Sequence, residues 1–359
     1  MERYLLCFLC LCLTVPTFAQ DGTTQRVEHH TAAVEHFEKL GTLFRHSAEQ
    51  AIPAVVSIRV TRTRAIGRST PFRVSEEGSG IVATIADRQV ILTNRHVIEE
   101  AERGSIEIMT HDRRLLTLTR FFANADFDVA IIEVAETLPQ SAVFGNSDQV
   151  RVGDIVLAIG NPFGLDRSVS MGIISAMGRR EVPGATISAP RIDFFQTDAA
   201  INPGSSGGML LNLRGEVIGV VTAIATQGGR NEGVAFVMPI NGVLRIAEQL
   251  VRTGTVVRPY IGFNFVSDGN FPMEDRRPLG IDRLIGARIH TVFSNSPAER
   301  AGLEVGDVVL MFGNTEVEND THILHLIAQS EIDEPVVLRI NREGEILDVT
   351  VTPIRFLSH

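Results

Sequence analysis

The sequence predicts a mostly β protein, with two β-barrels packed side by side and a third, smaller domain after them. Short apolar runs recur along the chain with turn-forming residues between them, which is typical of barrels and sandwiches. The chain has 359 residues, and at roughly 100–200 residues per domain this length predicts two or three domains. Hydrophobic residues make up 44% of the chain, which is enough to fill cores of that size.

The first 19 residues predict a cleavable secretory signal. Arg3 gives a positive start, and residues 5–15 are apolar but too short to span a bilayer. Thr17 and Ala19 offer small side chains at the two positions that a signal peptidase reads. A retained N-terminal anchor is the alternative. The cysteines all lie in this segment: Cys7, Cys10 and Cys12. The processed chain would therefore have no disulfide, no cysteine nucleophile and no thiolate metal site.

Residues 20–53 predict an N-terminal arm and a short helix. Residues 20–35 are polar and are expected to be flexible. From Val34 to Ile52 apolar residues recur at helical spacing, and Pro53 ends the pattern. This helix would present Phe37 and Phe44, either to its own domain or to another subunit.

A double-barrel domain is expected over residues 54–254. The first barrel would use strands at 55–60, 78–82, 90–93, 106–109, 115–118 and 129–134, with a long surface loop at 62–77. After a crossing at 139–148, the second barrel would use strands at 155–159, 168–176, 192–196, 209–213, 217–222 and 233–238. A helix at 241–253 then ends at Gly254 and Pro259. The third domain, 257–355, is expected to hold a helix at 320–330 and strands at 336–340 and 346–351.

The stretch from Thr197 to Asn212 carries the strongest chemical signal. Its centre, residues 204–208, places two serines among three glycines. Glycines allow a tight loop that aims backbone N–H groups at one point beside an exposed hydroxyl, as acyl transfer needs. An ordinary glycine-rich turn between strands is the alternative for this segment taken by itself.

A serine nucleophile needs a base, and the base needs a carboxylate that orients it. Of the histidines, only His96 lies at the end of a strong β-run. Asp128 enters an apolar strand, where an unpartnered carboxylate is costly. Each residue taken singly is more often structural, but together they give the chain order His, Asp, Ser of the chymotrypsin-like double barrel.

At these positions the sequence resembles the HtrA/Deg family of secreted serine proteases. The resemblance rests on residues 92–97 (LTNRHV), 128–130 (DVA), 160–164 (GNPFG) and 197–208, and it covers about residues 35–355. It implies that His96 is the general base, Asp128 its orienting carboxylate and Ser206 the nucleophile. It also implies an oxyanion hole made by backbone N–H groups of Gly204, Ser205 and Ser206.

Two positions depart from the family pattern. Ser205 stands where Asn is common, and Met209 stands where Pro is common. Because residue 205 contributes its backbone in either case, the loop is expected to survive, and the spacing to the two following glycines selects Ser206 as the nucleophile.

The primary substrate pocket is expected to be lined by uncharged side chains: Ile201, Val221, Thr222 and Ala223. Such a pocket favours Val, Ala or Leu before the scissile bond. Loops at 164–170, 178–191 and 225–232 would, by the resemblance, switch the site between an ordered active form and a collapsed form.

The third domain resembles the PDZ domain of the same family. A PDZ groove binds a C-terminal peptide as an added strand and receives its carboxylate on backbone donors. The carboxylate loop would be Tyr260, Ile261, Gly262 and Phe263, with residues 263–266 as the pairing strand and the helix at 321–329 as the opposite wall. A domain kept only for contacts within the protein is the alternative.

The predicted function is a periplasmic quality-control serine endopeptidase that cleaves unfolded or misfolded proteins and is regulated by C-terminal peptides. The resemblance implies a homotrimer with Phe37 and Phe44 at its contact, and no metal or cofactor is expected. The net charge of −10 argues against a nucleic-acid partner. The alternatives are a PDZ-bearing chaperone with silent barrels and a narrow-specificity protease of a stress-signalling pathway.

Overall fold

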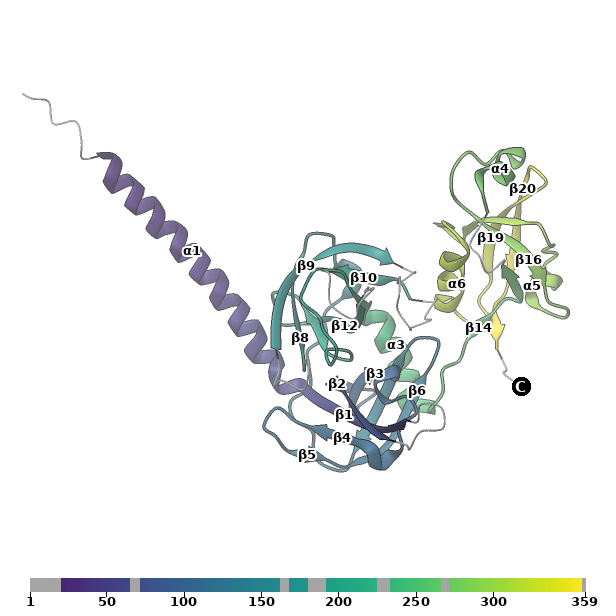
Figure 1. Cartoon of the computed structure of the whole chain (residues 1–359). Coiled ribbons are helices and arrows are strands. Elements are labelled where there is room, and N and C mark those ends of the chain that lie inside the picture. The colour runs from purple at the N-terminus through teal and green to yellow at the C-terminus, as the bar shows by residue number, and fades with distance from the viewer. Residues whose placement is uncertain are drawn as a thin grey trace, which may run out of the picture. The chain divides into compact units, whose positions relative to one another are not determined.

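The computed structural model describes residues 21–64, 72–161, 168–179, 192–224, 233–265 and 271–356, and it forms two compact units, residues 1–45 and 46–359 (Figure 1). The predicted mostly β class is confirmed for the second unit. The predicted signal segment and its cysteines lie outside the described residues.

Helix α1 spans Asp21–Ala51, so the prediction of a flexible arm at 20–35 is wrong for residues 21–35, which are helical. The chain has no proline between Gln20 and Ile52, and nothing in its backbone therefore interrupts the helix before Pro53. Phe37 is 75% exposed, whereas Phe44 is half-buried. No helix in the described ranges is both long and apolar enough to cross a membrane.

The first part of the second unit is a seven-stranded sheet in the order β5-β4-β1-β2-β3-β7-β6. Its hydrogen-bonded path does not close within the described residues, where the sequence predicted a barrel. The strands are β1 (Val55–Arg64), β2 (Phe72–Ile85), β3 (Arg88–Asn94), β4 (Ile106–Met109), β5 (Leu115–Leu116), β6 (Leu118–Asn124) and β7 (Val129–Val134). Helix α2 (Arg95–Ile98) follows β3 directly, and the last turn before β1 is a 3-10 helix, Ile52–Ala54.

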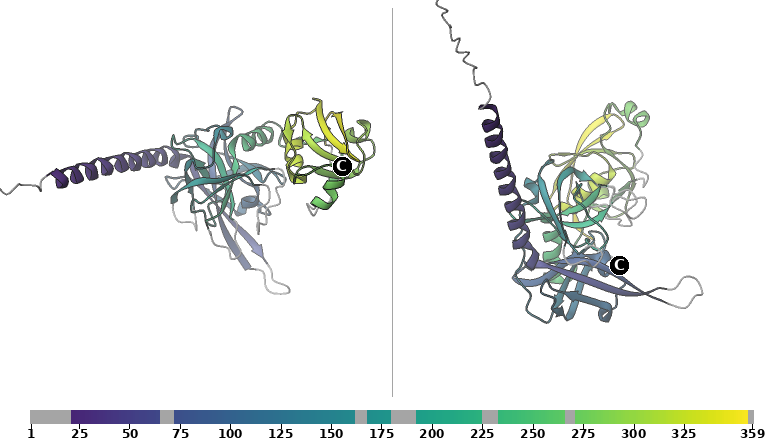
Figure 2. Two further views of the ribbon diagram at one scale, coloured as in Figure 1. Left: turned by 90° about the horizontal axis from the view of Figure 1, so that it is seen from above. Right: turned by 60° about the vertical axis from the view of Figure 1, so that its left-hand side comes forward.

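The prediction of a surface loop at 62–77 is wrong for residues 62–64 and 72–77, which belong to strands, and residues 65–71 lie outside the described residues. β1 and β2 pair continuously from Val55 opposite Ile81 to Arg64 opposite Phe72, and they run together beyond the rest of the sheet (Figure 2). Charged residues of this segment pair across the two strands, as Glu77 does with Arg59 of β1 directly opposite. Opposite charges facing each other stabilise a strand pair.

The second barrel is closed, with the strand order β10-β13-β12-β11-β8-β9. Its strands are β8 (Ile155–Gly160), β9 (Ser168–Arg179), β10 (Phe194–Thr197), β11 (Met209–Leu211), β12 (Val217–Ile224) and β13 (Ala235–Pro239). Helix α3 (Ile240–Thr253) follows, and it ends at Gly254 in the left-handed conformation, φ +75°, as the sequence predicted.

The third domain has a two-stranded pair and a larger sheet in the order β15-β16-β17-β19-β20, with β18 paired to β17. Its strands are β14 (Pro259–Tyr260), β15 (Phe263–Phe265), β16 (Ala287–Val292), β17 (Val308–Phe312), β18 (Thr315–Glu316), β19 (Val336–Arg342), β20 (Glu345–Val351) and β21 (Ile354–Arg355). Its helices are α4 (Met273–Arg276), α5 (Pro297–Arg300) and α6 (Asp320–Gln329). Ile323 of α6 and Leu338 of β19 are fully buried in its core.

Candidate active site

Asp128 is fixed at the point where β7 begins. Its side chain is buried and its backbone has φ +50°, a left-handed conformation that is uncommon outside glycine. Its carbonyl accepts hydrogen bonds from the backbone N–H of Arg95 at 3.1 Å and from Asn94 Nδ2 at 3.2 Å. The end of β3, the start of α2 and the carboxylate are therefore tied together.

His96 lies on helix α2 and contacts both oxygens of that carboxylate. Its Nδ1 is 2.7 Å from Asp128 Oδ2, and its backbone N–H donates to Asp128 Oδ1 at 2.9 Å. A carboxylate bound to Nδ1 holds the ring orientation and leaves Nε2 as the acceptor. The sequence-predicted pair is thus brought together.

A buried arginine, which the sequence reasoning missed, holds the end of α2. The Arg62 guanidinium donates to the carbonyls of Glu99 (3.0 Å), Val97 (3.1 Å) and His96 (3.3 Å), and it forms an ion pair with Glu76. The last carbonyls of a helix have no partner within the helix. One guanidinium from β1 therefore caps the short helix that carries His96.

The serine loop lies between β10 and β11. Gly204 and Gly207 have φ of +97° and +82°, which a residue with a side chain adopts only under strain. The Ser206 hydroxyl donates to the carbonyl of Thr222 at 3.2 Å, and Ser206 and His96 line the same cleft. Rotation of the hydroxyl toward the imidazole would be needed for proton transfer, which is common in unliganded sites.

The amides of the loop differ in what they contact. The Ser205 N–H donates to the carbonyl of Asn202 at 2.9 Å. The amides of Gly204 and Ser206 have no acceptor among the described residues. Two of the three amides expected in the oxyanion hole therefore have no partner in the described part of the chain, whereas that of Ser205 is occupied.

The cleft has a volume of about 410 Å³. Its lining residues are Ser75, Glu76, Glu77, His96, Val97, Pro203, Gly204 and Ser206. Arg59 Nε lies 2.7 Å from Glu77, and this hydrogen bond raises the pKa of Arg59 above its usual value. Both glutamates are thus paired with arginines of β1, which offsets the charge on this wall.

Of the four residues expected in the substrate pocket, the three with described side chains are buried and do not line the cleft. Ile201 and Val221 belong to the buried core cluster of the second barrel, and neither lines the cleft. Thr222 is buried, and its hydroxyl donates to the carbonyl of Val220 at 3.1 Å. The side chain of Ala223 lies outside the described residues, as do most residues of the three expected switching loops. The pocket assignment stays a prediction.

The expected peptide groove of the third domain lies at a free sheet edge. β15 is the terminal strand of its sheet, since among the described residues its one partner is β16. Just before it, the amides of Ile261 and Gly262 have no acceptor within the described ranges. Gly262 has φ +96°, and a Cβ there would lie 2.1 Å from Ser296 Cβ. An open strand edge beside two unpaired amides is the geometry that strand addition requires.

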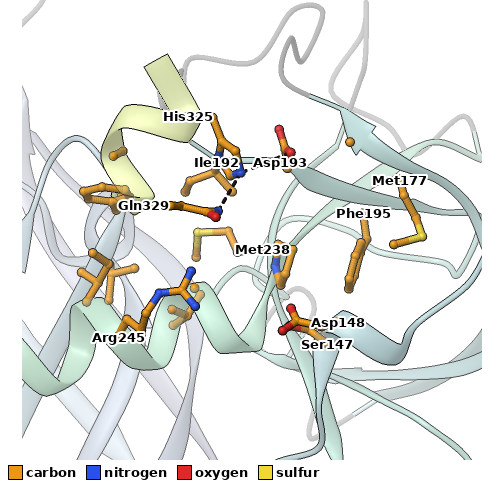
Figure 3. A pocket seen from close by; sticks show the side chains of 18 residues that line it. Ser147, Asp148, Met177, Ile192, Asp193, Phe195, Met238, Arg245, His325 and Gln329 are labelled. Atoms are coloured by element: carbon orange, nitrogen blue, oxygen red, sulfur yellow. Dashed lines mark hydrogen bonds and ion pairs between the residues drawn. The ribbon is translucent and has the colours of Figure 1, made fainter. Parts of the chain in front are cut away.

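A separate cavity of about 460 Å³ is shown in Figure 3. It shares no lining residue with the serine cleft. It is lined by residues of α3, of the β9 and β10 region and of α6, and inside it His325 lies 3.2 Å from Asp193. His325 also hydrogen-bonds Gln329 at 2.7 Å. Chemistry based on Ser206 belongs to the smaller cleft, because Ser206 and His96 both line it and neither lines this cavity. Among the described residues, no cluster of three His, Cys, Asp or Glu could hold a metal ion.

Two family models match the chain. A trypsin-like peptidase domain matches residues 78–220, and a PDZ domain matches residues 259–352. The first match contains His96, Asp128 and Ser206, and the second contains the expected peptide groove.

Several curated proteins are similar over most of the chain. A probable periplasmic serine endoprotease, DegP-like, of Chlamydia trachomatis is 39% identical over 79% of this chain and 53% of its own length. A protein of the same description from Ectopseudomonas mendocina is 33% identical over 94% of this chain and 68% of its own length. A putative serine protease, HhoB, of Synechocystis is 34% identical over 95% of this chain and 82% of its own length. The chain spans about half the length of the chlamydial relatives.

Solved structures agree with these matches. The HtrA-type protease AlgW with a decapeptide superposes with a TM-score of 0.68 at 28% identity and covers 87% of this chain and 98% of its own. A serine endoprotease from Yersinia pestis superposes with a TM-score of 0.60 at 30% identity, with coverage of 87% and 98%.

Proposed function

The chain belongs to the HtrA/DegP-like family of serine endoproteases, and from that membership we propose that it hydrolyses peptide bonds in unfolded or misfolded proteins. The observation that carries the proposal is the 2.7 Å contact between His96 Nδ1 and Asp128 in the cleft that also holds Ser206. The three residues lie far apart in the chain, on helix α2, just before β7 and in the loop between β10 and β11, and this convergence supports the proposal.

In the proposed mechanism the Ser206 hydroxyl turns from the Thr222 carbonyl toward His96 and attacks the scissile carbonyl. His96 Nε2 takes the proton, and Asp128 stabilises the imidazolium that forms. The amides of Gly204 and Ser206 donate to the developing oxyanion. His96 then gives the proton to the leaving amine, and water releases the acyl group by the same steps in reverse.

The PDZ domain would bind a C-terminal peptide along the free edge of β15. The amides of Ile261 and Gly262 would receive its carboxylate, and α6 would form the opposite wall. The bound decapeptide of the AlgW structure supports a peptide ligand, since that protein is similar over most of this chain. Peptide binding would favour the active form of the serine loop, in a periplasmic homotrimer whose contact includes Phe37 and Phe44.

The experiment is hydrolysis of unfolded casein together with labelling by a fluorophosphonate, which reacts with an activated serine. The wild-type protein should cleave casein and become labelled, and Ser206→Ala should lose both while keeping its thermal transition. Ser205→Ala is the matched control, since it removes the neighbouring hydroxyl and should keep the labelled serine.

Labelling of Ser206→Ala would contradict the nucleophile assignment. If the wild-type protein is neither labelled nor able to cleave casein, yet suppresses the aggregation of unfolded casein, the protein is a chaperone with catalytically silent barrels and the protease proposal is wrong.

A further inference from the structure

Ser79 of β2 contacts the serine loop from the opposite sheet. It is fully buried in the seven-stranded sheet, between Gly78 and Gly80. Its backbone N–H donates to the carbonyl of Ser206 at 2.8 Å, and its hydroxyl lies 2.8 Å from the carbonyl of Gly204. One residue therefore holds two carbonyls of the loop that carries the nucleophile.

The direction of each hydrogen bond at this hydroxyl is fixed by its partners. The backbone N–H of Asn161 can only donate, so Ser79 Oγ accepts it at 2.8 Å. The Gly204 carbonyl can only accept, so the single hydroxyl proton of Ser79 goes there. The carbonyl of Ser79 is itself held by Thr93 Oγ1 at 2.7 Å, which anchors the residue in its own sheet.

Holding the Gly204 carbonyl also orients the next amide. A trans peptide is planar, so its N–H points away from its C=O. With the Gly204 carbonyl turned toward Ser79, the Ser205 N–H points the other way and meets the Asn202 carbonyl at 2.9 Å. A rotated Gly204–Ser205 peptide would lose both hydrogen bonds, and it would change the directions of the neighbouring Gly204 and Ser206 amides, whose residues line the cleft.

We propose that the Ser79 hydroxyl is a positioning residue that holds the oxyanion loop in its donating conformation, an inference that rests on the proposed protease function. It touches neither the substrate nor the reacting atoms. It acts through the Gly204 carbonyl on the amides that meet the oxyanion.

The test compares Ser79→Ala and Ser79→Cys with wild type, and Ser147→Ala is the matched control. Ser147 is also buried, and its hydroxyl accepts a backbone N–H, that of Asn241, at 3.1 Å, away from the serine cleft. The readouts are kcat and KM on a fluorogenic peptide with valine before the scissile bond, and the affinity for a peptide boronic acid, which forms a tetrahedral adduct on serine.

Loss of one direct oxyanion donor lowers kcat by about 10²–10³-fold, so loss of the group that orients the donors should lower kcat by about 10–100-fold. KM should stay within about twofold, and the boronic acid should bind more weakly by a factor similar to the loss in kcat. Ser79→Cys, which keeps the size with a weaker donor, should fall between wild type and Ser79→Ala. Ser147→Ala should keep the wild-type kcat and boronic acid affinity.

Wild-type kcat and boronic acid affinity in Ser79→Ala would overturn the proposal, as would equal losses in Ser147→Ala. If Ser79→Ala shows no cooperative thermal transition, Ser79→Cys carries the same test. A wild-type protein that neither cleaves the peptide nor binds the boronic acid would refute the protease function itself, before any variant is compared.

Discussion

Gly207→Ala should disable the site through the backbone rather than through any catalytic group. A Cβ at Gly207 would lie 2.0 Å from the carbonyl oxygen of Ser79 and 2.4 Å from Thr93 Oγ1, well inside the 3.4 Å at which ordinary contact begins. The carbonyl belongs to a buried strand and accepts the Thr93 hydroxyl, so neither atom can swing aside. The loop must therefore move by more than an ångström.

The expected loss of stability has two parts. A left-handed backbone costs alanine about 1–2 kcal/mol relative to glycine, and forcing an atom into a packed site costs about 1–3 kcal/mol. At about 2–4 °C per kcal/mol for a domain of this size, the sum of about 2–5 kcal/mol lowers Tm by about 4–20 °C. Displacement of reacting groups by about 1 Å lowers the rate about 10²-fold.

Gly153→Ala is the matched control for this prediction. Gly153 has φ +95°, but no atom lies within 4 Å of where its Cβ would be. It should lose only the backbone part, about 2–8 °C in Tm, and keep its kcat. Tm is measured by circular dichroism and kcat with the fluorogenic peptide. Equal losses of Tm in the two variants, with wild-type kcat in Gly207→Ala, would refute the steric reasoning.

Three further changes test other parts of the molecule. Asp128→Asn should keep the fold and lower kcat by about 10⁴-fold, because an amide neither stabilises the imidazolium nor fixes its tautomer; a loss below tenfold would contradict the orienting role. Arg62→Gln should lower both Tm and kcat, because it leaves buried carbonyls at the end of α2 without a donor, which costs about 1–3 kcal/mol of stability. An unchanged Tm would show that water replaces the guanidinium. Gly262→Ala should weaken the binding of a C-terminal peptide at least about tenfold, because its Cβ would clash with Ser296. Fluorescence polarisation measures this affinity, and hydrolysis of a short peptide should continue. Unchanged peptide affinity would contradict the assignment of the groove to this loop.

The features of the fold that the sequence predicted correctly are those that depend on a continuous stretch of residues. The strands at 106–109 and 129–134 have the predicted bounds, because alternating or continuous apolar runs there face a buried side. The sequence singles out His96 and Asp128 as candidates because each stands at the end or start of such a run. Only the structure shows that both carboxylate oxygens of Asp128 contact His96, because a sequence pattern carries no information on distances between separate segments.

Residues that act by hydrogen-bonding backbone groups escaped prediction. Arg62 lay in an apparently polar loop, and only the extended β1–β2 pairing brings it to the carbonyls of α2. The sequence predicts Ser79 only as part of a strand, and its flanking glycines are a signal that could have identified it. A Cβ at Gly78 would lie 2.4 Å from Val97, and one at Gly80 would lie 2.6 Å from Ile91. Glycines on both sides of a buried serine thus mark a close approach of other chain segments.

The serine loop is packed directly on the backbone of two different sheets. A Cβ at Gly208 would meet the Ile159 carbonyl of β8 at 2.4 Å, just as one at Gly207 would meet the Ser79 carbonyl of β2. Any switch to a collapsed form has to break the hydrogen bonds from Ser79 to Gly204 and Ser206, each worth about 1 kcal/mol net. A coupling free energy between two sites is about 1–3 kcal/mol. The proposed regulation by peptide binding would therefore need a coupling free energy of ordinary size to select one form of this loop, and removing the Ser79 hydroxyl should make the proposed collapsed form easier to reach.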